Sequence, residues 1–221
     1  PFGPELNGYI CNVDGTIEQS KFEIEREISD TDSASVDVGG LTSSTFIVFW
    51  YDTGGVNGYR YNRFGTDGNK DYSDQNLLDY QGSYAIYSAV MSSTRHALIW
   101  CESGDSDLTF EIFDDSLTSQ AGPTDIDTTV GTLTQSQADA SALTSSKFIT
   151  VWSDRDANNV YFASYNNDGT ADISQTSVAS TSDDTQPCAV SAYDCRADVS
   201  HGGNFIVAYA INETYAEWKA Y

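Results

Sequence analysis

The sequence predicts an all-β protein of β-propeller type, built from about four antiparallel units of four strands and about fifty residues each. Two segments, 41–52 and 143–154, agree at eight of twelve positions and lie 102 residues apart. Short stretches that alternate apolar and polar residues recur after them, and no long stretch shows the 3.6-residue period of a helix. A β-sandwich made of the same strands is the alternative.

The most regular element is an apolar strand with a large aromatic residue near its end, here called the anchor strand. Trp50, Trp100, Trp152 and Tyr209 mark four copies, spaced by 50, 52 and 57 residues. A period of this length indicates repeated units that bury a core between neighbours, so we expect these residues to be packing anchors. The predicted units span approximately residues 1–30 (partial), 31–80, 81–131, 132–182 and 183–221 (partial).

A second strand follows each anchor strand and alternates as a half-buried strand does. Its copies are residues 59–64, 108–113, 160–165 and 214–221. The first and third copies lead into Asp67-Gly68 and Asp168-Gly169, and the same pair occurs at Asp14-Gly15. Asp-Gly supplies the residue with positive φ that a tight hairpin needs. We expect a small-residue strand before each anchor strand and a weaker outer strand after each hairpin.

This unit resembles the propeller repeats of secreted microbial surface proteins, in which a Phe-x-Val-x-Trp strand leads to an Asp-containing turn, an aromatic strand and an Asp-Gly hairpin. Residues 46–68 and 148–169 carry the pattern, and three or four repeats cover nearly the whole chain. The units with Trp100 and Tyr209 lack the Trp-x-Asp ending. The resemblance implies a propeller fold and a secreted, extracellular or cell-surface location, but no single activity, because one fold hosts many functions.

The charge excludes two classes of partner. The chain has 33 Asp and Glu against 10 Lys and Arg, a formal net charge of -23. Such a charge repels phosphate backbones and anionic lipid surfaces, and no apolar stretch is long enough for a membrane-spanning helix. We expect neither nucleic-acid binding nor membrane insertion.

Two features concern covalent modification. Cys188 and Cys195 lie seven residues apart, and a disulfide between them is predicted, with Cys11 and Cys101 paired or free. Asn212 begins the only Asn-x-Thr sequon and is the candidate N-glycosylation site, which makes the protein a predicted glycoprotein. A chance three-residue match is the alternative.

Carboxylates cluster in the turns that follow the anchor strands. Ca²⁺ takes six to eight oxygen ligands, so these turns are the candidate metal site. None has the Asp-x-Asp-x-Asp-Gly spacing with a distant Glu, and solvated acidic loops are the alternative. The candidate ligands are Asp52, Asp105, Asp107, Asp154 and Asp156.

The sequence predicts no catalytic residue. His96 and His201 precede anchor strands, where we expect solvated turns, and neither belongs to a nucleophile motif. A glycosidase would need one specific carboxylate pair, which 33 acidic residues do not single out. The chain has six arginines but not the Ser-x-Asp-x-Gly-x-x-Trp turns of sialidases. We therefore predict a protein that is not an enzyme.

Both ends of the chain contain a copy of the alternating strand, so unpaired strand edges are expected there. Head-to-tail addition of such edges between copies gives filaments when the rotation does not close. The alternatives are closure within one chain and a chain whose two ends are cut from a longer repeat array. We predict a structural or adhesive extracellular protein that presents surfaces or assembles with itself. The predicted assembly edge consists of Tyr9, Ile10, Cys11, Tyr215 and Trp218.

Glycan binding is the alternative function. The chain has 14 tyrosines and 4 tryptophans, and aromatic rings stack on sugar rings while acidic and amide groups bind hydroxyls. Tyrosines at alternate strand positions also pack between units, which is the competing explanation for their number.

Overall fold

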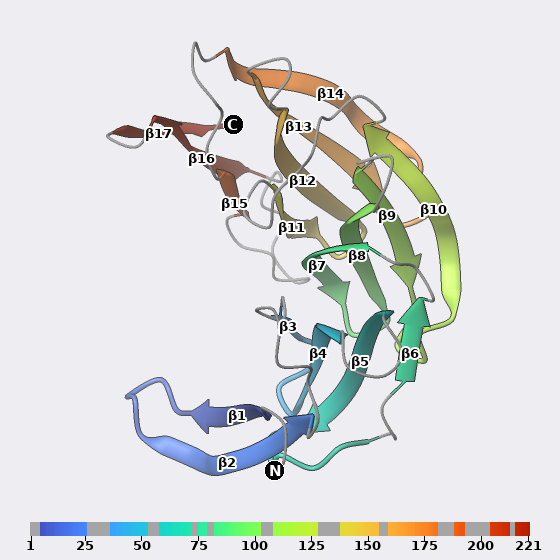
Figure 1. Ribbon diagram of the computed structural model, residues 1–221, viewed down its shortest axis with the longest axis vertical. Helices are drawn as coiled ribbons and strands as arrows, with labels where there is room; N and C mark the ends of the chain where they lie inside the picture. Colours follow the sequence, from blue (N-terminus) through green and yellow to red (C-terminus); the bar gives the residue numbers. More distant parts are fainter. Residues whose placement is uncertain are drawn as a thin grey trace. The chain divides into compact units, whose positions relative to one another are not determined.

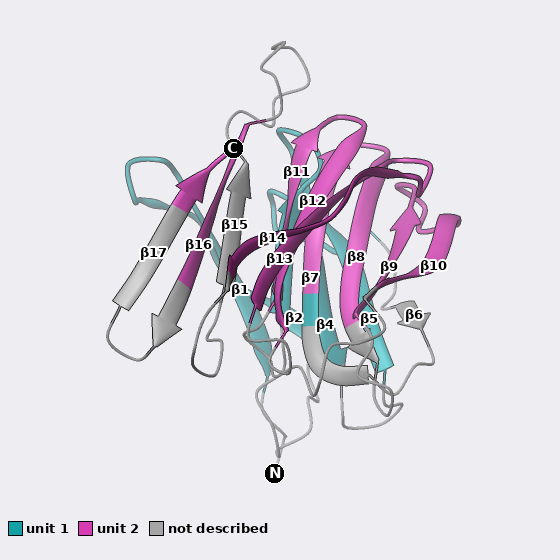
Figure 2. Ribbon diagram, turned by 90° about the horizontal axis from the view of Figure 1, so that it is seen from above, with its two compact units in different colours: residues 1–86 teal, residues 87–221 magenta. Residues whose placement is uncertain are grey.

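The computed structural model describes residues 5–25, 36–52, 58–71, 75–78, 82–102, 108–127, 138–154, 159–180, 188–192, 204–212 and 215–221. Over these ranges every strand is antiparallel to its neighbours and no helix occurs, so none of the described residues forms a helix able to cross a membrane. The chain divides into two compact units, Pro1–Ile86 and Tyr87–Tyr221 (Figure 2).

The first unit contains one two-stranded and one four-stranded sheet (Figure 1). In both sheets the strands are ordered as they follow one another in the chain. The two-stranded sheet consists of β1 (Leu6–Cys11) and β2 (Ile17–Glu25); the four-stranded sheet consists of β3 (Val36–Gly40), β4 (Thr45–Asp52), β5 (Gly58–Gly65) and β6 (Gln75–Leu78).

The second unit contains two four-stranded sheets and one three-stranded sheet, again in chain order. Its sheets are β7 (Gly82–Ser92, which starts in the first unit), β8 (Arg95–Glu102), β9 (Leu108–Phe113) and β10 (Ser119–Asp127); β11 (Ala138–Thr144), β12 (Lys147–Asp154), β13 (Asn159–Asn166) and β14 (Ala171–Ser180); and β15 (Cys188–Ala192), β16 (Phe205–Asn212) and β17 (Tyr215–Ala220). The prediction of four-stranded antiparallel sheets is confirmed.

The anchor strands β4, β8, β12 and β16 lie second in their sheets, with a strand on either side. Trp50, Trp100 and Trp152 are completely buried, and Tyr209 is 2% exposed. Residues 97–100 of β8 are also completely buried, so both faces of this strand are covered. Burial on both faces explains why the anchor strands are continuous apolar runs rather than alternating ones.

Within each unit the sheets pack face to face. In the first unit, Val48, Trp50 and Phe64 form a core with Ile24 of β2. In the second unit, one core joins β7–β10 to β11–β14 and a second joins β11–β14 to β15–β17. Trp152 and Tyr209 therefore contribute to the contacts between successive sheets of the second unit.

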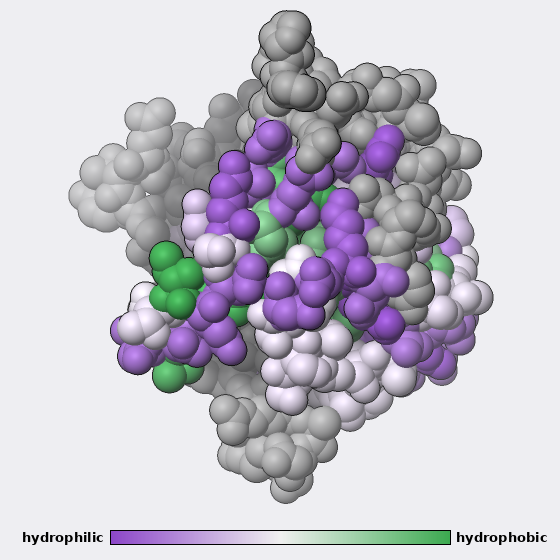
Figure 3. All heavy atoms as spheres, turned by 90° about the horizontal axis from the view of Figure 1, so that it is seen from below, coloured by the Kyte–Doolittle hydropathy of each residue, from purple (hydrophilic) through white to green (hydrophobic). Residues whose placement is uncertain are grey.

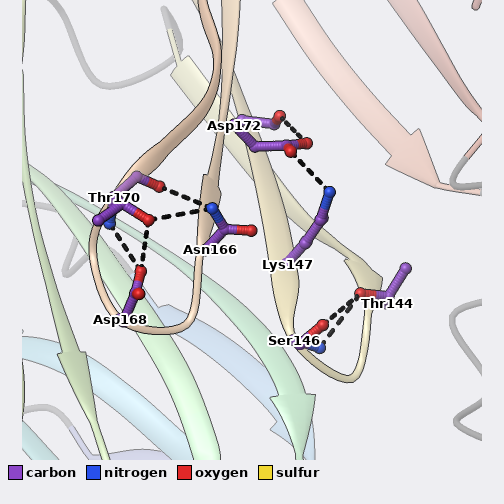
Figure 4. Close-up of polar contacts among 8 residues, drawn as sticks. Thr144, Ser146, Lys147, Asn166, Asp168, Thr170 and Asp172 are labelled. Carbon is purple, nitrogen blue, oxygen red and sulfur yellow. Dashed lines mark hydrogen bonds and ion pairs between the residues drawn. The ribbon is translucent and has the colours of Figure 1, made fainter.

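Figure 4 shows the hairpin between β13 and β14, whose hydrogen bonds recur in the hairpin between β1 and β2. At Asn166–Thr170, the Thr170 backbone N–H and hydroxyl donate to Asp168 Oδ1 at 3.0 and 2.6 Å, and Gly169 has a φ of 83°. The β1–β2 hairpin repeats this, with 2.9 and 2.6 Å from Thr16 to Asp14 and a φ of 82° at Gly15. These bonds lower the pKa of both aspartates.

The hairpin of the sheet β7–β10 reaches the same backbone without glycine. Leu117, at the position of Gly169, has a φ of 60°. Asp114 here accepts from the backbone N–H groups of Ser116 and Thr118, both at 3.0 Å. The turn thus keeps its shape although the backbone of a leucine adopts the left-handed conformation, which is unfavourable for residues other than glycine.

His96 corrects the sequence-based expectation of a solvated turn residue. It is the second residue of β8 and completely buried, with its ring stacked on Phe113 at 6.2 Å. The other anchor strands have phenylalanine at this place, and these pair as Phe46–Phe64, Phe148–Tyr165 and Phe205–Tyr221 at 5.5, 5.4 and 5.1 Å. The imidazole therefore fills a ring position of the repeat rather than a loop position.

A third ring from the preceding sheet completes these pairs. Phe110 lies 4.5 Å from Tyr165, and Phe162 lies 5.1 Å from Phe205. In β1 the residue at the position of Phe110 is Gly8, three residues before the strand end. The ring of Phe22 fills this space instead, because a Cβ at Gly8 would lie 2.5 Å from it.

The described surface is largely hydrophilic on the face drawn in Figure 3, as expected for a chain with a net charge of -23. The large apolar side chains that are exposed in the described ranges lie mostly in the first unit. Those of the first unit are Tyr9, Val13, Ile17, Val36 and Val38.

Candidate functional site

A charged pair lies between the two sheets of the first unit. The register of β4 and β5 places Arg60 directly opposite Trp50, and Asn62 opposite Val48. Direct cross-strand partners share one face of a sheet. This is the face that packs on β1 and β2, so the sequence places a guanidinium group in an otherwise apolar contact.

The partner of Arg60 is the last residue of β2. Arg60 Nη1 lies 3.7 Å from Glu25 Oε2, and the two side chains are 19% and 14% exposed. The separation exceeds that of a hydrogen bond, so this contact is an ion pair rather than a close bidentate contact. Both groups are largely desolvated, which strengthens their interaction with any polar group that reaches them.

An anchor tryptophan lies directly opposite Arg60 on the face of this pair. Trp50 is completely buried beside Arg60, and its indole Nε1 has no hydrogen-bond partner among the described residues. Tyr59 and Tyr61 flank Arg60 in β5 and point to the other face, where Tyr59 packs on Tyr51 at 5.1 Å between ring centroids. A guanidinium, a carboxylate and aromatic carbons together can bind a small polar ligand with an apolar face.

The other sheets have different residues at the position of Arg60. The residues opposite Trp100, Trp152 and Tyr209 are Thr109, Tyr161 and Glu217. Among the described strands, an arginine therefore lies opposite an anchor residue in one sheet, β3–β6, and there it meets a carboxylate of the neighbouring sheet β1–β2.

Of the predicted metal ligands, Asp154 is the one whose side chain lies in the described part of the chain. Asp154 is 4% exposed at the end of β12, and Asp52 ends β4. Asp105, Asp107 and Asp156 lie outside the described residues, as does the side chain of Asp52. Within the described ranges no group of three His, Cys, Asp or Glu could hold a metal ion.

The predicted modification and assembly residues are placed as follows. Cys11 is a free, exposed cysteine in β1, Tyr9 is 59% exposed, and Ile10 is half-buried. Cys188 begins β15 and Asn212 ends β16, while Tyr215 and Trp218 belong to β17. Cys195, His201 and the side chains of Cys101, Cys188, Asn212, Tyr215 and Trp218 lie outside the described residues, so the Cys188–Cys195 disulfide and the glycosylation stay predictions.

Sequence reasoning missed the Arg60–Glu25 pair, because it weighed the arginines only against the sialidase pattern. A usable signal was present, since Arg60 is the one basic residue opposite an anchor tryptophan. Its carboxylate partner gave no signal, because Glu25 lies 35 positions earlier and in another sheet.

Comparison with known proteins bears on the fold. No protein-family model and no curated protein matches this chain. Among solved structures, a triple arginine-to-alanine mutant of AofleA from Arthrobotrys oligospora matches with a TM-score of 0.65 and 8% identity over 94% of this chain. The chain spans 59% of that protein. The structural neighbours are of β-propeller type. The chain has a β-propeller-like fold.

The Aleuria aurantia lectin gives two further matches. Its complex with alpha-methyl-L-fucoside has a TM-score of 0.58 and 12% identity, covering 99% of this chain and 71% of the lectin. Its complex with Fucalpha1-6GlcNAc has a TM-score of 0.51 and 10% identity, covering 89% and 64%. The propeller prediction is thus confirmed, and the β-sandwich alternative is wrong.

Proposed function

We propose that this protein is a non-catalytic carbohydrate-binding protein, and that Arg60 and Glu25 form its binding site beside Trp50. The observation that carries the proposal is the largely desolvated Arg60–Glu25 pair between two sheets of a propeller-like fold. Glycan binding thereby replaces the structural or adhesive role as the function best supported, while self-assembly and extracellular location stay predictions.

The chemistry of the pair suits vicinal hydroxyl groups. A guanidinium only donates hydrogen bonds and an ionised carboxylate only accepts them. Arg60 Nη1 and Glu25 Oε2 lie 3.7 Å apart, so a sugar hydroxyl that reaches them would accept from the guanidinium and donate to the carboxylate.

The overall charge narrows the ligand class to neutral sugars. A chain with a net charge of -23 repels sialylated, sulfated and uronic-acid glycans at long range. One structurally similar protein, the Aleuria aurantia lectin, matches in two structures that contain fucose-containing ligands. Methyl α-L-fucoside is therefore the first probe, followed by other neutral monosaccharides.

Titration calorimetry of the full chain with these sugars tests the proposal. We expect saturable binding at a Kd between roughly 1 μM and 1 mM, as for a site with few polar contacts. Arg60→Ala should abolish it. The matched control is Arg63→Ala, because Arg63 lies on the opposite face of β5 and pairs with Asp71 at 2.7 Å. Equal affinity in the two variants, or no binding of any neutral sugar, would overturn the proposal.

A further inference from the structure

The fourth strand of each four-stranded sheet is an edge strand, because it pairs with the third strand alone in the described part of the chain. These strands are β6, β10 and β14. The sheet β11–β14 is complete, and each of its faces packs on another sheet of the second unit. The outer edge of β14 therefore belongs to a finished sheet between two neighbours.

The other outer strands have the features that usually prevent an edge from pairing with another chain. β6 is four residues long. β10 contains Pro123 and two aspartates, and Gly122 before the proline has a φ of 107°. β2, the last strand of the two-stranded sheet, contains four charged residues. Short length, charges and proline all protect an edge strand.

β14 has none of these protections over most of its length. It has ten residues, and positions 173–180 contain neither a charge nor a proline. Its one charged residue, Asp172, is paired within its own sheet, because Lys147 Nζ donates to it at 2.6 Å (Figure 4) and Ser164 Oγ at 3.2 Å. Register shifts against the third strand occur in β10 as well as in β14, so they do not distinguish the two edges.

The open section of this edge spans residues 171–177, all of which are exposed. Beyond it, Val178 is 4% exposed and its carbonyl accepts a hydrogen bond from Lys219 of β17. Within the section, the Ser174 carbonyl lies at a register shift and accepts from Thr176 Oγ1 at 2.8 Å. A backbone N–H of an added strand can replace that local bond.

The side chains of this section suit pairing with a second copy of the same strand. Residues 174–177 are Ser, Gln, Thr and Ser, whose side chains both donate and accept hydrogen bonds. When two such strands pair antiparallel around Gln175, Ser174 of each copy lies opposite Thr176 of the other. Hydroxyl side chains directly opposite each other stabilise a strand pair.

The charge of the chain favours this pairing over other contacts between copies. Two copies with a net charge of -23 repel each other, so contacts that bring carboxylates together are unfavourable. In the antiparallel pair, Asp172 of each copy lies three residues from the centre, on opposite sides. The two carboxylates are then about 20 Å apart along the strands, well beyond the screening length of about 8 Å at physiological salt.

We propose that this protein forms a two-fold symmetric dimer in which the open sections of two β14 strands pair antiparallel around Gln175. The two β11–β14 sheets thereby become one continuous sheet. A contact between identical surfaces closes on itself, so the product is a dimer and not a filament. The contact also differs from the assembly edge predicted from the sequence, and it is independent of sugar binding at Arg60.

Sedimentation velocity of the full chain tests the proposal. We expect a dimer whose fraction rises with protein concentration and with salt, because salt screens the repulsion between the copies. Gln175→Lys places two ammonium groups opposite each other and should raise the dimer Kd at least about tenfold. The matched control is Ser119→Lys, which adds the same charge at an exposed position of β10 and should leave the Kd unchanged.

A cross-link locates the contact. Residues opposite each other in an antiparallel pair have Cα atoms about 4.5–5.5 Å apart, within the range of a disulfide. Gln175→Cys, made together with Cys11→Ser to remove the exposed thiol, should therefore give a 175–175 disulfide dimer under mild oxidation, identified by mass spectrometry. A protein that stays monomeric up to about 1 M salt, a dimer weakened equally by both lysine variants, or a dimer that forms no 175–175 link would overturn the proposal.

Discussion

Replacing the buried histidine of β8 should change how stability depends on pH. Burial lowers the pKa of His96 from 6.5 to about 4, because a charged imidazole would be desolvated; Asp114 and Asp115 oppose this effect and Arg95 adds to it. Between these values the unfolded chain binds a proton that the folded chain does not, so folding stability falls as the pH falls from 6.5 to about 4. The loss amounts to about 3 kcal/mol, since each pKa unit corresponds to about 1.4 kcal/mol.

The variant His96→Phe removes this proton and keeps the ring pair, as Phe46, Phe148 and Phe205 do elsewhere. Urea unfolding of both proteins, followed by tryptophan fluorescence between about pH 4 and pH 7, measures the effect. The free energy of unfolding of the variant relative to the parent should rise by about 3 kcal/mol from pH 7 to pH 4. Titrations of carboxylates that do not interact with His96 cancel in this difference. A difference that stays constant over this range would refute the argument, whatever its size at pH 7.

Four substitutions test the local rules of the fold. Leu117→Gly should stabilise the protein by about 1 kcal/mol, because glycine tolerates the positive φ there, and Gly169→Leu should destabilise it by a similar amount; urea unfolding measures both. Gly8→Ala should cost about 1–3 kcal/mol through the clash of its Cβ with the ring of Phe22, and a loss that Phe22→Leu fails to reduce would contradict this cause. Asp168→Ala should lower the melting temperature at neutral pH, because the hydrogen bonds of Thr170 that lower the pKa of Asp168 are lost. Those bonds are retained above the ordinary carboxyl pKa and disappear as the pH falls through the lowered value, so thermal scans should show the deficit shrinking there.

Sequence reasoning succeeded where a strand carries its own signal. The anchor strands are predictable because burial on both faces requires an unbroken apolar run, and the hairpins because Asp-Gly has the backbone freedom that the turn needs. It failed at His96, whose neighbours in sequence resemble a turn, because the need for a ring there becomes visible only when the sheets are aligned. For the same reason the sequence could not predict that the ring of Phe22 fills the space at Gly8. This depends on which residues face each other across β1 and β2.

The position of the Arg60–Glu25 pair in the repeat allows a second site to be built. Tyr161 occupies the position of Arg60, opposite Trp152. Asp127 occupies that of Glu25, since each is the ninth residue of its strand and pairs with the first residue of the third strand. Tyr161→Arg therefore places an arginine opposite Trp152, in the sheet that packs on β7–β10, where the strand position of Asp127 corresponds to that of Glu25.

Titration calorimetry of Tyr161→Arg with the sugar that the parent binds should show a stoichiometry rising from one site toward two. Tyr161→Lys is the matched control, because an ammonium group lacks the planar donor geometry of a guanidinium and should not create the site. The double variant with Arg60→Ala should then bind through the new site alone, with a stoichiometry of one. If the double variant binds no sugar, an arginine paired with a carboxylate beside an anchor tryptophan is not a sufficient recognition element in this fold.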